Sequence, residues 1–378
     1  MENLSLNESS KKKINIIKLI FIIMFSIIIS IFPILWISGV SAGKNYEKKV
    51  LANAPKLKNM FLEYPTFAGD FEKYYNDTFP FKSKIISLYS LIEYKFFNSS
   101  ILPSVTSVGK NGWLFYENYG TRNAISGNRM FTPGELEYIY NGIMKKYETL
   151  KSMNKEYIVY IAPEKQTIYP EYDLLSKSKY TSIDQLLEYL AQKECPVSVL
   201  YGKDFLLSKK EKNKNIYYKY DTHWNKLGSY YGYLDVMSQV KKLLPDNNIL
   251  IAESYETTTY KYSGDLAGTL FLSNYLSETS PQLNFSYKPT FSNENGVTLI
   301  NSSTPSDLKV FIYGDSFAQA TYWSASFAQS AKEVRILHNK NTFKKLLDNI
   351  GDSDIVIEEC VQRVPTTLGK CILEEPST

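Results

Sequence analysis

The segment Lys309-Val310-Phe311-Ile312-Tyr313-Gly314-Asp315-Ser316 joins an apolar run to a glycine, an aspartate and a serine. Residues 309–313 are rich in β-branched and aromatic side chains, so they predict a buried strand. Gly314 permits a tight turn directly after this strand. Ser316 is then expected at a strand-to-helix turn on the carboxyl edge of a sheet, where open α/β folds bind ligands. Its backbone N–H, at a helix start, would help to stabilise an oxyanion. The alternative is a serine or aspartate that only caps the helix.

Four more apolar segments predict strands of the same sheet. They are residues 157–162, 197–201, 333–338 and 354–358. The segments between strands are long enough to hold helices, which parallel strands need as crossovers. The expected fold is therefore α/β, with a parallel sheet flanked by helices. Residues 250–305 are rich in Ser, Thr, Asn and Tyr, and indicate an insertion of loops and small strands.

Capping residues mark two helix starts. Thr132 is followed by Pro133 and Glu135, the pattern of a capping box with proline at the first helical position. Apolar residues then recur at helical spacing, so a helix is expected to follow. Ser182 together with Gln185 predicts a second helix with a similar box.

The N-terminal region predicts a single membrane-spanning anchor. Residues 1–18 form a polar tail that includes Lys11, Lys12, Lys13 and Lys18. Residues 19–40 are almost continuously apolar and uncharged, and at about 1.5 Å per residue they span roughly 33 Å, enough to cross a bilayer core. Because positive charge favours the cytoplasmic side, we expect the tail in the cytoplasm and the rest of the chain outside. A cleaved signal peptide is the alternative, since residues 40–42 resemble a cleavage site.

Composition excludes several classes of protein. The chain has 378 residues and a net charge of +4, without the basic footprint of a nucleic-acid-binding protein. Its two histidines and three cysteines form no C-x-x-C pair, so we expect neither a metal nor a cofactor. A Cys360–Cys371 disulfide remains open from the sequence.

The segment Asp221-Thr222-His223-Trp224-Asn225 contains one of the two histidines. In an extended segment Asp221 and His223 point the same way, because side chains alternate faces. A carboxylate beside an imidazole fixes its tautomer and stabilises the imidazolium, as a base in acyl transfer requires. The alternative is a capping aspartate beside a buried histidine. Asn225 is expected to cap the next helix.

Together, the serine turn and the Asp-x-His segment resemble the SGNH (GDSL-type) hydrolase superfamily. They resemble more closely its alginate O-acetyltransferase branch, the AlgX/AlgJ-like and "DHHW" proteins of bacterial cell surfaces. The resemblance covers roughly residues 70–365, and the histidine motif precedes the serine, as in that branch. The chain departs from the family pattern at Thr222, where a histidine is usual, and at Gln362, where an acidic residue is common. The other matching segments are Phe79-Pro80-Phe81, Gly112-Trp113-Leu114-Phe115, Pro163-Glu164-Lys165, Tyr169-Pro170, Gly264-Asp265-Leu266 and a terminal strand ending at Arg363.

The resemblance implies that Ser316 is an acetyl-carrying nucleophile, His223 its general base and Asp221 the residue that orients the base. The implied protein is an O-acetyltransferase that modifies a cell-surface or secreted polysaccharide and receives acetyl groups from a membrane-bound O-acyltransferase partner. Residues 41–100 are expected to be a helical connector and residues 101–378 the extracytoplasmic catalytic domain. A carbohydrate acetyl esterase with the same triad, or a catalytically silent glycan-binding assembly protein, are the alternatives.

Four other residues are predicted to contact substrate or to form walls of the site: Lys165, Trp224, Asp265 and Arg363. For Lys165 the alternative is a solvated lysine at a strand end. Asp315 is interpreted as a turn or cap residue. His338 ends a strand without an acidic neighbour, so it is interpreted as structural.

Overall fold

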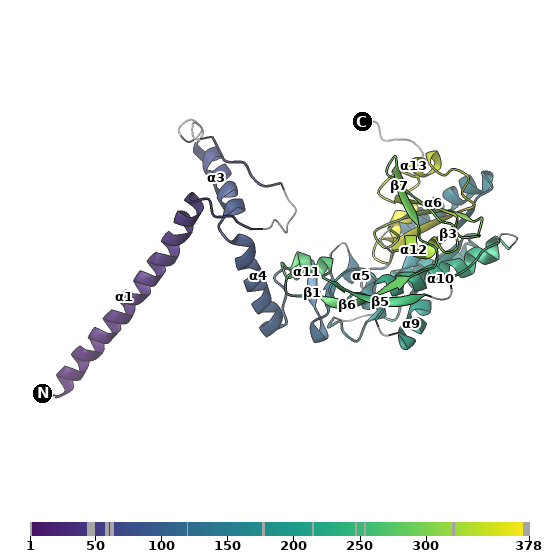
Figure 1. Ribbon diagram of the computed structural model, residues 1–378. Coiled ribbons are helices and arrows are strands. Elements are labelled where there is room, and N and C mark those ends of the chain that lie inside the picture. The colour runs from purple at the N-terminus through teal and green to yellow at the C-terminus, as the bar shows by residue number, and fades with distance from the viewer. Residues whose placement is uncertain are drawn as a thin grey trace. The chain divides into compact units, whose positions relative to one another are not determined.

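The computed structural model describes residues 2–43, 50–56, 60, 64–118, 120–175, 178–213, 215–245, 248–252, 255–319 and 322–372. The chain divides into two units, Met1–Ile92 and Glu93–Thr378, whose elements are labelled in Figure 1.

The first unit contains α1 (Glu2–Ile37), α3 (Tyr64–Thr78) and α4 (Lys82–Ile92). Within α1, the 22 residues Ile16–Ile37 have the length and apolar composition to cross a membrane, as an anchor or a signal sequence does. The end of α1 packs on α3: the Trp36 indole donates to Thr78 Oγ1 at 2.8 Å, and its ring contacts those of Phe71 and Tyr75.

The second unit is built on a seven-stranded sheet. Five strands are parallel neighbours in the order β4 (Ser198–Tyr201), β3 (Glu156–Ala162), β11 (Ile355–Val361), β9 (Lys309–Gly314) and β10 (Glu333–His338). The predicted strands are thus confirmed. Two further strands, β8 (Val297–Asn301) and β7 (Thr290–Glu294), extend the sheet beyond β10 as antiparallel neighbours.

The predicted α/β fold is confirmed, and the sheet is mixed because an antiparallel hairpin extends its parallel strands. The last two strands form a hairpin whose turn holds Asn295 at φ 53° and Gly296 at φ 78°. Asn-Gly favours this geometry, because a tight hairpin needs positive φ at both turn residues.

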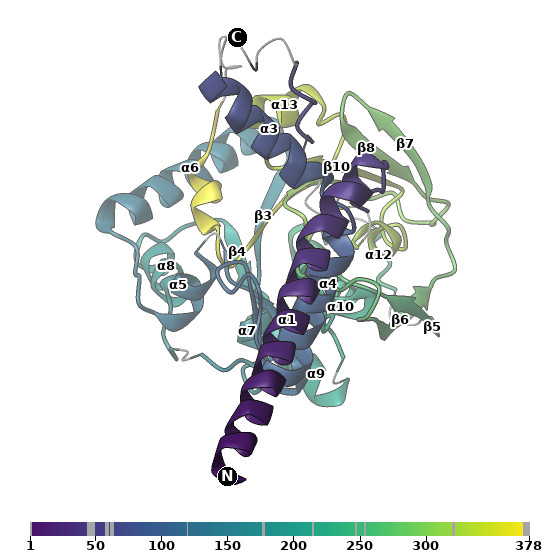
Figure 2. The same cartoon turned by 90° about the vertical axis from the view of Figure 1, so that its left-hand side faces the viewer.

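Two apolar cores lie on opposite faces of the sheet, because alternate residues of a strand point to opposite sides. On β9, Val310 and Ile312 belong to one core, and Phe311 and Tyr313 to the other. Side chains of α9 (Lys203–Lys212), α10 (Lys226–Leu243) and α12 (Ser324–Phe327) complete the first core. Side chains of α6 (Pro133–Ser152), α8 (Ser182–Gln192) and α13 (Phe343–Asp348) complete the second. In Figure 2 the ribbons of α6 and α8 lie to the left of β3, and those of α10 and α12 to its right.

The predicted helix starts are confirmed in two cases, and the capping box predicted for a third lies elsewhere. Thr132 and Glu135 form the expected capping box at α6, and Asn225 caps α10 by accepting two backbone N–H groups. The box at α8 lies one residue earlier than predicted, because Thr181 and Asp184 form it.

Smaller elements border the sheet. A hairpin is formed by β1 (Thr106–Val108) and β2 (Leu114–Tyr116), and a second antiparallel pair by β5 (Glu256–Tyr262) and β6 (Glu278–Asn284). The remaining helical elements are α5 (Thr121–Ser126), α7 (Lys165–Ile168), α11 (Asp265–Thr269), the π-helical η1 (Glu93–Phe97) and the 3-10 segments η2 (Lys110–Gly112) and η3 (Pro365–Gly369).

All three cysteines are free thiols in the structure. Cys360 is buried in β11, and Cys195 and Cys371 are half-buried. The Cys360–Cys371 disulfide that the sequence left open is not formed.

Candidate active site

The turn after β9 is held by its own aspartate. Asp315 Oδ1 accepts the N–H of Phe317 at 2.9 Å, and Oδ2 accepts the N–H of Val361 on β11 at 2.8 Å. A Cβ on Gly314 would lie 2.7 Å from that of Ala318, so glycine is needed at this close approach. The interpretation of Asp315 as a turn residue is confirmed, and the turn leaves Ser316 partly exposed.

A second carboxyl lies beneath the same turn. Glu359 on β11 is fully buried, and its Oε2 accepts the N–H of Asp315 at 3.0 Å. Burial and the neighbouring Asp315 carboxylate raise the pKa of Glu359 well above the usual range. A protonated Glu359 therefore avoids two adjacent negative charges under the turn.

The helix expected at Ser316 is absent. Residues 315–319 form turns and bends, and α12 begins at Ser324. The backbone N–H of Ser316 therefore gains nothing from a helix dipole, which corrects the prediction. Among the residues that the structure describes, this N–H has no hydrogen-bond acceptor, so it is available to an oxyanion.

A short closed loop carries the Asp-x-His segment. Tyr217 and Trp224 form an antiparallel bridge at its base, and Tyr218 N–H donates to the His223 carbonyl at 3.3 Å. The helix α10 follows immediately, starting from the Asn225 cap. The loop therefore projects Asp221 and His223 from a fixed base beside the sheet.

The structure brings together the three residues predicted to be catalytic. His223 Nε2 lies 2.9 Å from Ser316 Oγ, and His223 Nδ1 lies 2.7 Å from Asp221 Oδ1. Because the Asp221 carboxylate accepts the Nδ1 proton, Nε2 is left to accept the Ser316 hydroxyl proton. Asp221 is buried, whereas 15% of the His223 side chain is exposed.

Asp221 is saturated with donors. Besides His223 Nδ1, its oxygens accept the His223 N–H at 2.9 Å, the Tyr262 hydroxyl at 2.9 Å and the Asp265 N–H at 2.8 Å. Burial alone raises the pKa of Asp221, but these bonds and the His223 charge outweigh burial and hold the pKa below the usual range. Burial likewise lowers the pKa of His223, and the Asp221 carboxylate more than reverses it, so that pKa is raised.

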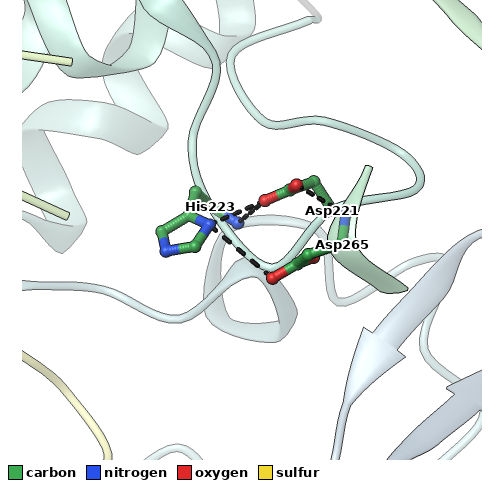
Figure 3. A group of neighbouring side chains, drawn as sticks. All are labelled: Asp221, His223 and Asp265. Carbon is green, nitrogen blue, oxygen red and sulfur yellow. Dashed lines mark hydrogen bonds and ion pairs between the residues drawn. The ribbon is translucent and has the colours of Figure 1, made fainter. Parts of the chain in front are cut away.

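A second carboxylate faces the same imidazole. Asp265 Oδ2 lies 3.9 Å from His223 Nδ1, and Asp265 Oδ1 accepts the Thr222 N–H at 2.7 Å. Figure 3 shows both carboxylates on one side of the ring, while the other ring nitrogen points away from them. The pKa of Asp265 is raised, by burial and by the Asp221 charge. Even so, 47% of its side chain is exposed.

These three side chains also form a possible cation-binding group. Ligand atoms of Asp221, His223 and Asp265 lie within 4.8 Å of one another. The sequence did not predict this donor set. A cation bound to His223 Nδ1 would replace the hydrogen bond to Asp221. Metal ligation at that atom and use of the Asp221–His223 pair as a base therefore exclude each other.

Aromatic rings that the sequence did not single out surround the imidazole. The rings of Phe317 and Tyr322 lie 4.9 Å and 5.4 Å from that of His223, with Tyr322 stacked. Tyr262, which donates to Asp221, lies in the polar insertion and carried no recognisable signal. Phe317 follows Ser316 directly, and this closeness in sequence was the one signal available.

Two of the predicted wall residues are buried. Trp224 is fully buried, donates through Nε1 to the Phe317 carbonyl at 3.2 Å and packs in the first core. Lys165 is 1% exposed and donates to backbone carbonyls. The interpretation of Lys165 as a solvated strand-end lysine is wrong, because its ammonium lies inside the protein.

Arg363 lies beside the turn that carries Ser316, because its guanidinium contacts the ring of Phe317. Its guanidinium donates to Glu164 Oε1 at 2.6 Å and lies over the rings of Tyr116 and Phe317. The Gln362 amide, at a family departure, supports the pair because its Oε1 accepts the Glu164 N–H at 2.9 Å. Arg363 opposes protonation of His223.

His338 ends β10 in a local turn. Its Nδ1 accepts the Lys340 N–H at 3.2 Å, and its carbonyl accepts the Asn341 side-chain amide at 2.8 Å. Its pKa is lowered, by burial and by Lys340. These contacts agree with the interpretation of His338 as structural.

A sheet whose central strand leads to a serine, with an Asp-x-His pair at hydrogen-bond distance, defines an SGNH-type domain. The chain belongs to the family described as "SGNH hydrolase-like domain, acetyltransferase AlgX", which matches residues 106–333. This membership confirms the resemblance drawn from the sequence.

Named relatives agree with this family. The "Probable alginate O-acetylase AlgJ" of Azotobacter vinelandii is 24% identical over 216 residues, 56% of this chain and 53% of that protein. The chain thus spans about half the length of this curated relative. The structure of Bacillus cereus PatB1 with a sulfonyl adduct has a TM-score of 0.50 at 16% identity, covers 69% of this chain and 95% of PatB1, and shows a shared fold.

Proposed function

We propose that this protein transfers acetyl groups to hydroxyls of a cell-surface or secreted polysaccharide through an acetyl-serine intermediate. The observation that carries the proposal is the chain of contacts from Ser316 Oγ through His223 to Asp221, at 2.9 Å and 2.7 Å. Membership of the AlgX family supports acetyl transfer, and the relative named as an alginate O-acetylase supports a polysaccharide acceptor.

The reaction has two halves that share one base. In the first, His223 Nε2 takes the Ser316 proton while Oγ attacks the acetyl carbonyl of the donor. The imidazolium then protonates the leaving group, and acetyl-serine remains. In the second, His223 takes the proton of a sugar hydroxyl, whose oxygen attacks the acetyl carbon. Ser316 Oγ leaves and recovers that proton. The Asp221 carboxylate stabilises the imidazolium in both halves.

The proposed setting is the outer side of a membrane. Residues 19–40 would anchor the chain, with the lysine-containing tail of residues 1–18 in the cytoplasm, the connector 41–100 outside and the catalytic domain 101–378 following it. A membrane-bound O-acyltransferase would supply acetyl groups across the bilayer. Of the residues predicted to contact substrate, we retain Asp265 and Arg363, which lie beside the imidazole and the nucleophile turn.

The test uses the purified full-length chain, p-nitrophenyl acetate as donor, and assays with and without oligosaccharide acceptors. We expect acetylated oligosaccharide from the wild type. We expect near-complete loss in Ser316→Ala and in His223→Ala, because general-base assistance alone is worth about 10²–10⁴-fold. Ser152→Ala is the matched control, since Ser152 is exposed on α6.

Each of the other outcomes supports a different function for this protein. Acetate release without any acetylated sugar identifies an esterase. Failure of a sulfonyl fluoride to label Ser316 identifies a non-catalytic glycan-binding protein. Full activity in Ser316→Ala would falsify the acetyl-serine mechanism.

The membrane setting has its own test. Carbonate extraction of membranes should leave the full-length protein in the pellet, and externally added protease should degrade the catalytic domain in intact spheroplasts. Co-purification with a membrane-bound O-acyltransferase is expected under mild detergent. A protein that is released by carbonate and starts after residue 42 would identify a cleaved signal peptide instead.

A further inference from the structure

Lys165 lies inside the protein, directly behind the Asp-x-His loop. It begins α7, just after β3, and is 1% exposed. Its Nζ donates to the carbonyls of Tyr218 at 3.1 Å, Lys219 at 3.4 Å and Asp221 at 2.5 Å. Three backbone oxygens of one short loop therefore converge on a single buried cation.

The number of donors matches the number of acceptors. A lysine ammonium has three N–H donors and no acceptor, and here each donor has a carbonyl. Main-chain N–H groups take two other carbonyls of the loop: Ala267 N–H donates to Tyr220, and Tyr218 N–H to His223. Lys165 fixes the peptide plane that follows Asp221 through the Asp221 carbonyl, and the Ala267 N–H fixes the plane that precedes Asp221 through the Tyr220 carbonyl.

We propose that Lys165 is a positioning residue for the base, whose ammonium holds residues 218–221 so that Asp221 and His223 reach Ser316. This inference rests on the proposed function, since it concerns how that base is held. It also assigns a role to the β1–β2 hairpin, which carries Trp113 and Phe115. The rings of Trp113 and Phe115 lie 5.9 Å and 5.3 Å from Nζ. Aromatic faces attract a cation, so the hairpin helps to retain the charge.

Four carboxylates face the ammonium from the surrounding elements: Asp221 on the loop, Asp265 on α11, Glu278 on β6 and the adjacent Glu164. Burial lowers the pKa of Lys165 to about 8, although these four charges oppose the shift. Above that pH the amine has two N–H donors and a lone pair, so one loop carbonyl loses its donor. The hydrogen bonds from Lys165 that position the loop of Asp221 and His223 should therefore weaken as pH rises past about 8.

The test measures the rate at which phenylmethanesulfonyl fluoride labels Ser316 in the full-length protein from pH 5.5 to 9.5. In this reaction Ser316 Oγ attacks sulfur, fluoride leaves and His223 takes the proton, so no natural substrate is needed. The wild-type rate should rise as His223 loses its proton and fall above about pH 8. Lys165→Met, which keeps an unbranched chain without donors, should label about 10²-fold more slowly, as for a misplaced catalytic group.

The shape of the pH profile separates positioning from stability alone. Lys165→Met should lack the alkaline fall, because the titrating group is gone. Lys288→Met, at an exposed position, should match the wild type. The proposal is overturned if Lys165→Met is labelled at the wild-type rate. It is also overturned if Lys165→Met keeps the alkaline fall and its rate drops only in proportion to the fraction of unfolded protein measured by circular dichroism.

Two remaining outcomes are also decisive. If Lys165→Met does not fold, a wild-type rate that stays level from pH 8 to 9.5 overturns the proposal, whereas a fall above pH 8 supports it. If the wild type itself is not labelled at Ser316, the proposed function fails first, and the two failures are thereby distinguished.

Discussion

Replacing Asp265 by asparagine tests the electrostatics of the base. Asp265 Oδ2 lies 3.9 Å from His223 Nδ1, beyond hydrogen-bond distance but within reach of its charge. Asparagine removes that charge while its side-chain oxygen can still accept the Thr222 N–H. The substitution therefore isolates the charge of the second carboxylate from its structural contact.

The expected size follows from Coulomb's law. At 3.9 Å and an effective dielectric constant near 20, two unit charges attract by about 4 kcal/mol. Because 47% of the Asp265 side chain is exposed, solvent screening reduces this to about 1 kcal/mol. Because this attraction favours the imidazolium, its loss should lower the pKa of His223.

The sign can be read from the acid side of the rate profile. A negative neighbour favours the imidazolium, so its removal leaves His223 neutral at lower pH. The midpoint of the rise in Ser316 labelling should therefore move to lower pH. The plateau should drop a few-fold, because a less basic imidazole accepts the proton less readily.

The assay compares sulfonyl fluoride labelling of the wild type, Asp265→Asn and Asp307→Asn between pH 5 and 8. Asp307 is the control, since 88% of its side chain is exposed. A midpoint in Asp265→Asn that does not move, or that moves upward, would refute the view that Asp265 acts on the imidazole through its charge.

Three further predictions concern the sheet and its turn. Because the folded-state pKa of Glu359 is raised, wild-type stability should fall as pH rises from about 4.3 towards that pKa. The melting temperature of Glu359→Gln should therefore fall less than that of the wild type between pH 5 and 8. An equal fall in both proteins would count against a protonated Glu359. Lys146→Met leaves the buried Glu358 carboxylate without its partner 2.5 Å away, so the free energy of unfolding in urea should fall by about 3–5 kcal/mol. The Lys146→Met/Glu358→Met double variant should recover most of this loss. A double variant that recovers none of it contradicts the explanation by an unpaired charge. Gly314→Ala places a Cβ 2.7 Å from that of Ala318, so Ser316 labelling should be lost, and unchanged labelling would show that the turn has room.

The sequence was informative where apolar patterning and turn chemistry act locally. Buried parallel strands have continuous apolar runs, so all five were recognisable. By contrast, β7 is exposed along its whole length, and no apolar alternation marks it. Asn295-Gly296 was the available signal for its hairpin, but it lay in a polar insertion. The misplaced box at α8 had a similar cause, because Thr181 and Ser182 are both good caps.

The sequence predicted the three central residues of the candidate site but not the residues that hold them in position. Ser316, His223 and Asp221 were recognisable because their motifs are compact in sequence. The contact of Lys165 with the Asp221 carbonyl joins residues 56 apart, and such a contact leaves no local pattern. A buried lysine and a solvated one look alike in a sequence, because burial depends on which distant segments pack against it.

The hydrogen bond between the Ser316 turn and β11 has a consequence for the synthesis of the protein. Asp315 accepts the N–H of Val361, and β11 is inserted between β3 and β9, pairing Ile355 with Glu156 and Val310. Such contacts between distant segments close late in folding, since the entropy of a long loop must first be overcome. A nascent chain whose β11 has not yet left the ribosome therefore contains both Ser316 and His223, but the turn that positions Ser316 is not yet formed. Ser316 should therefore become reactive only after β11 has been synthesised, so the incomplete chain should not react with acetyl donors.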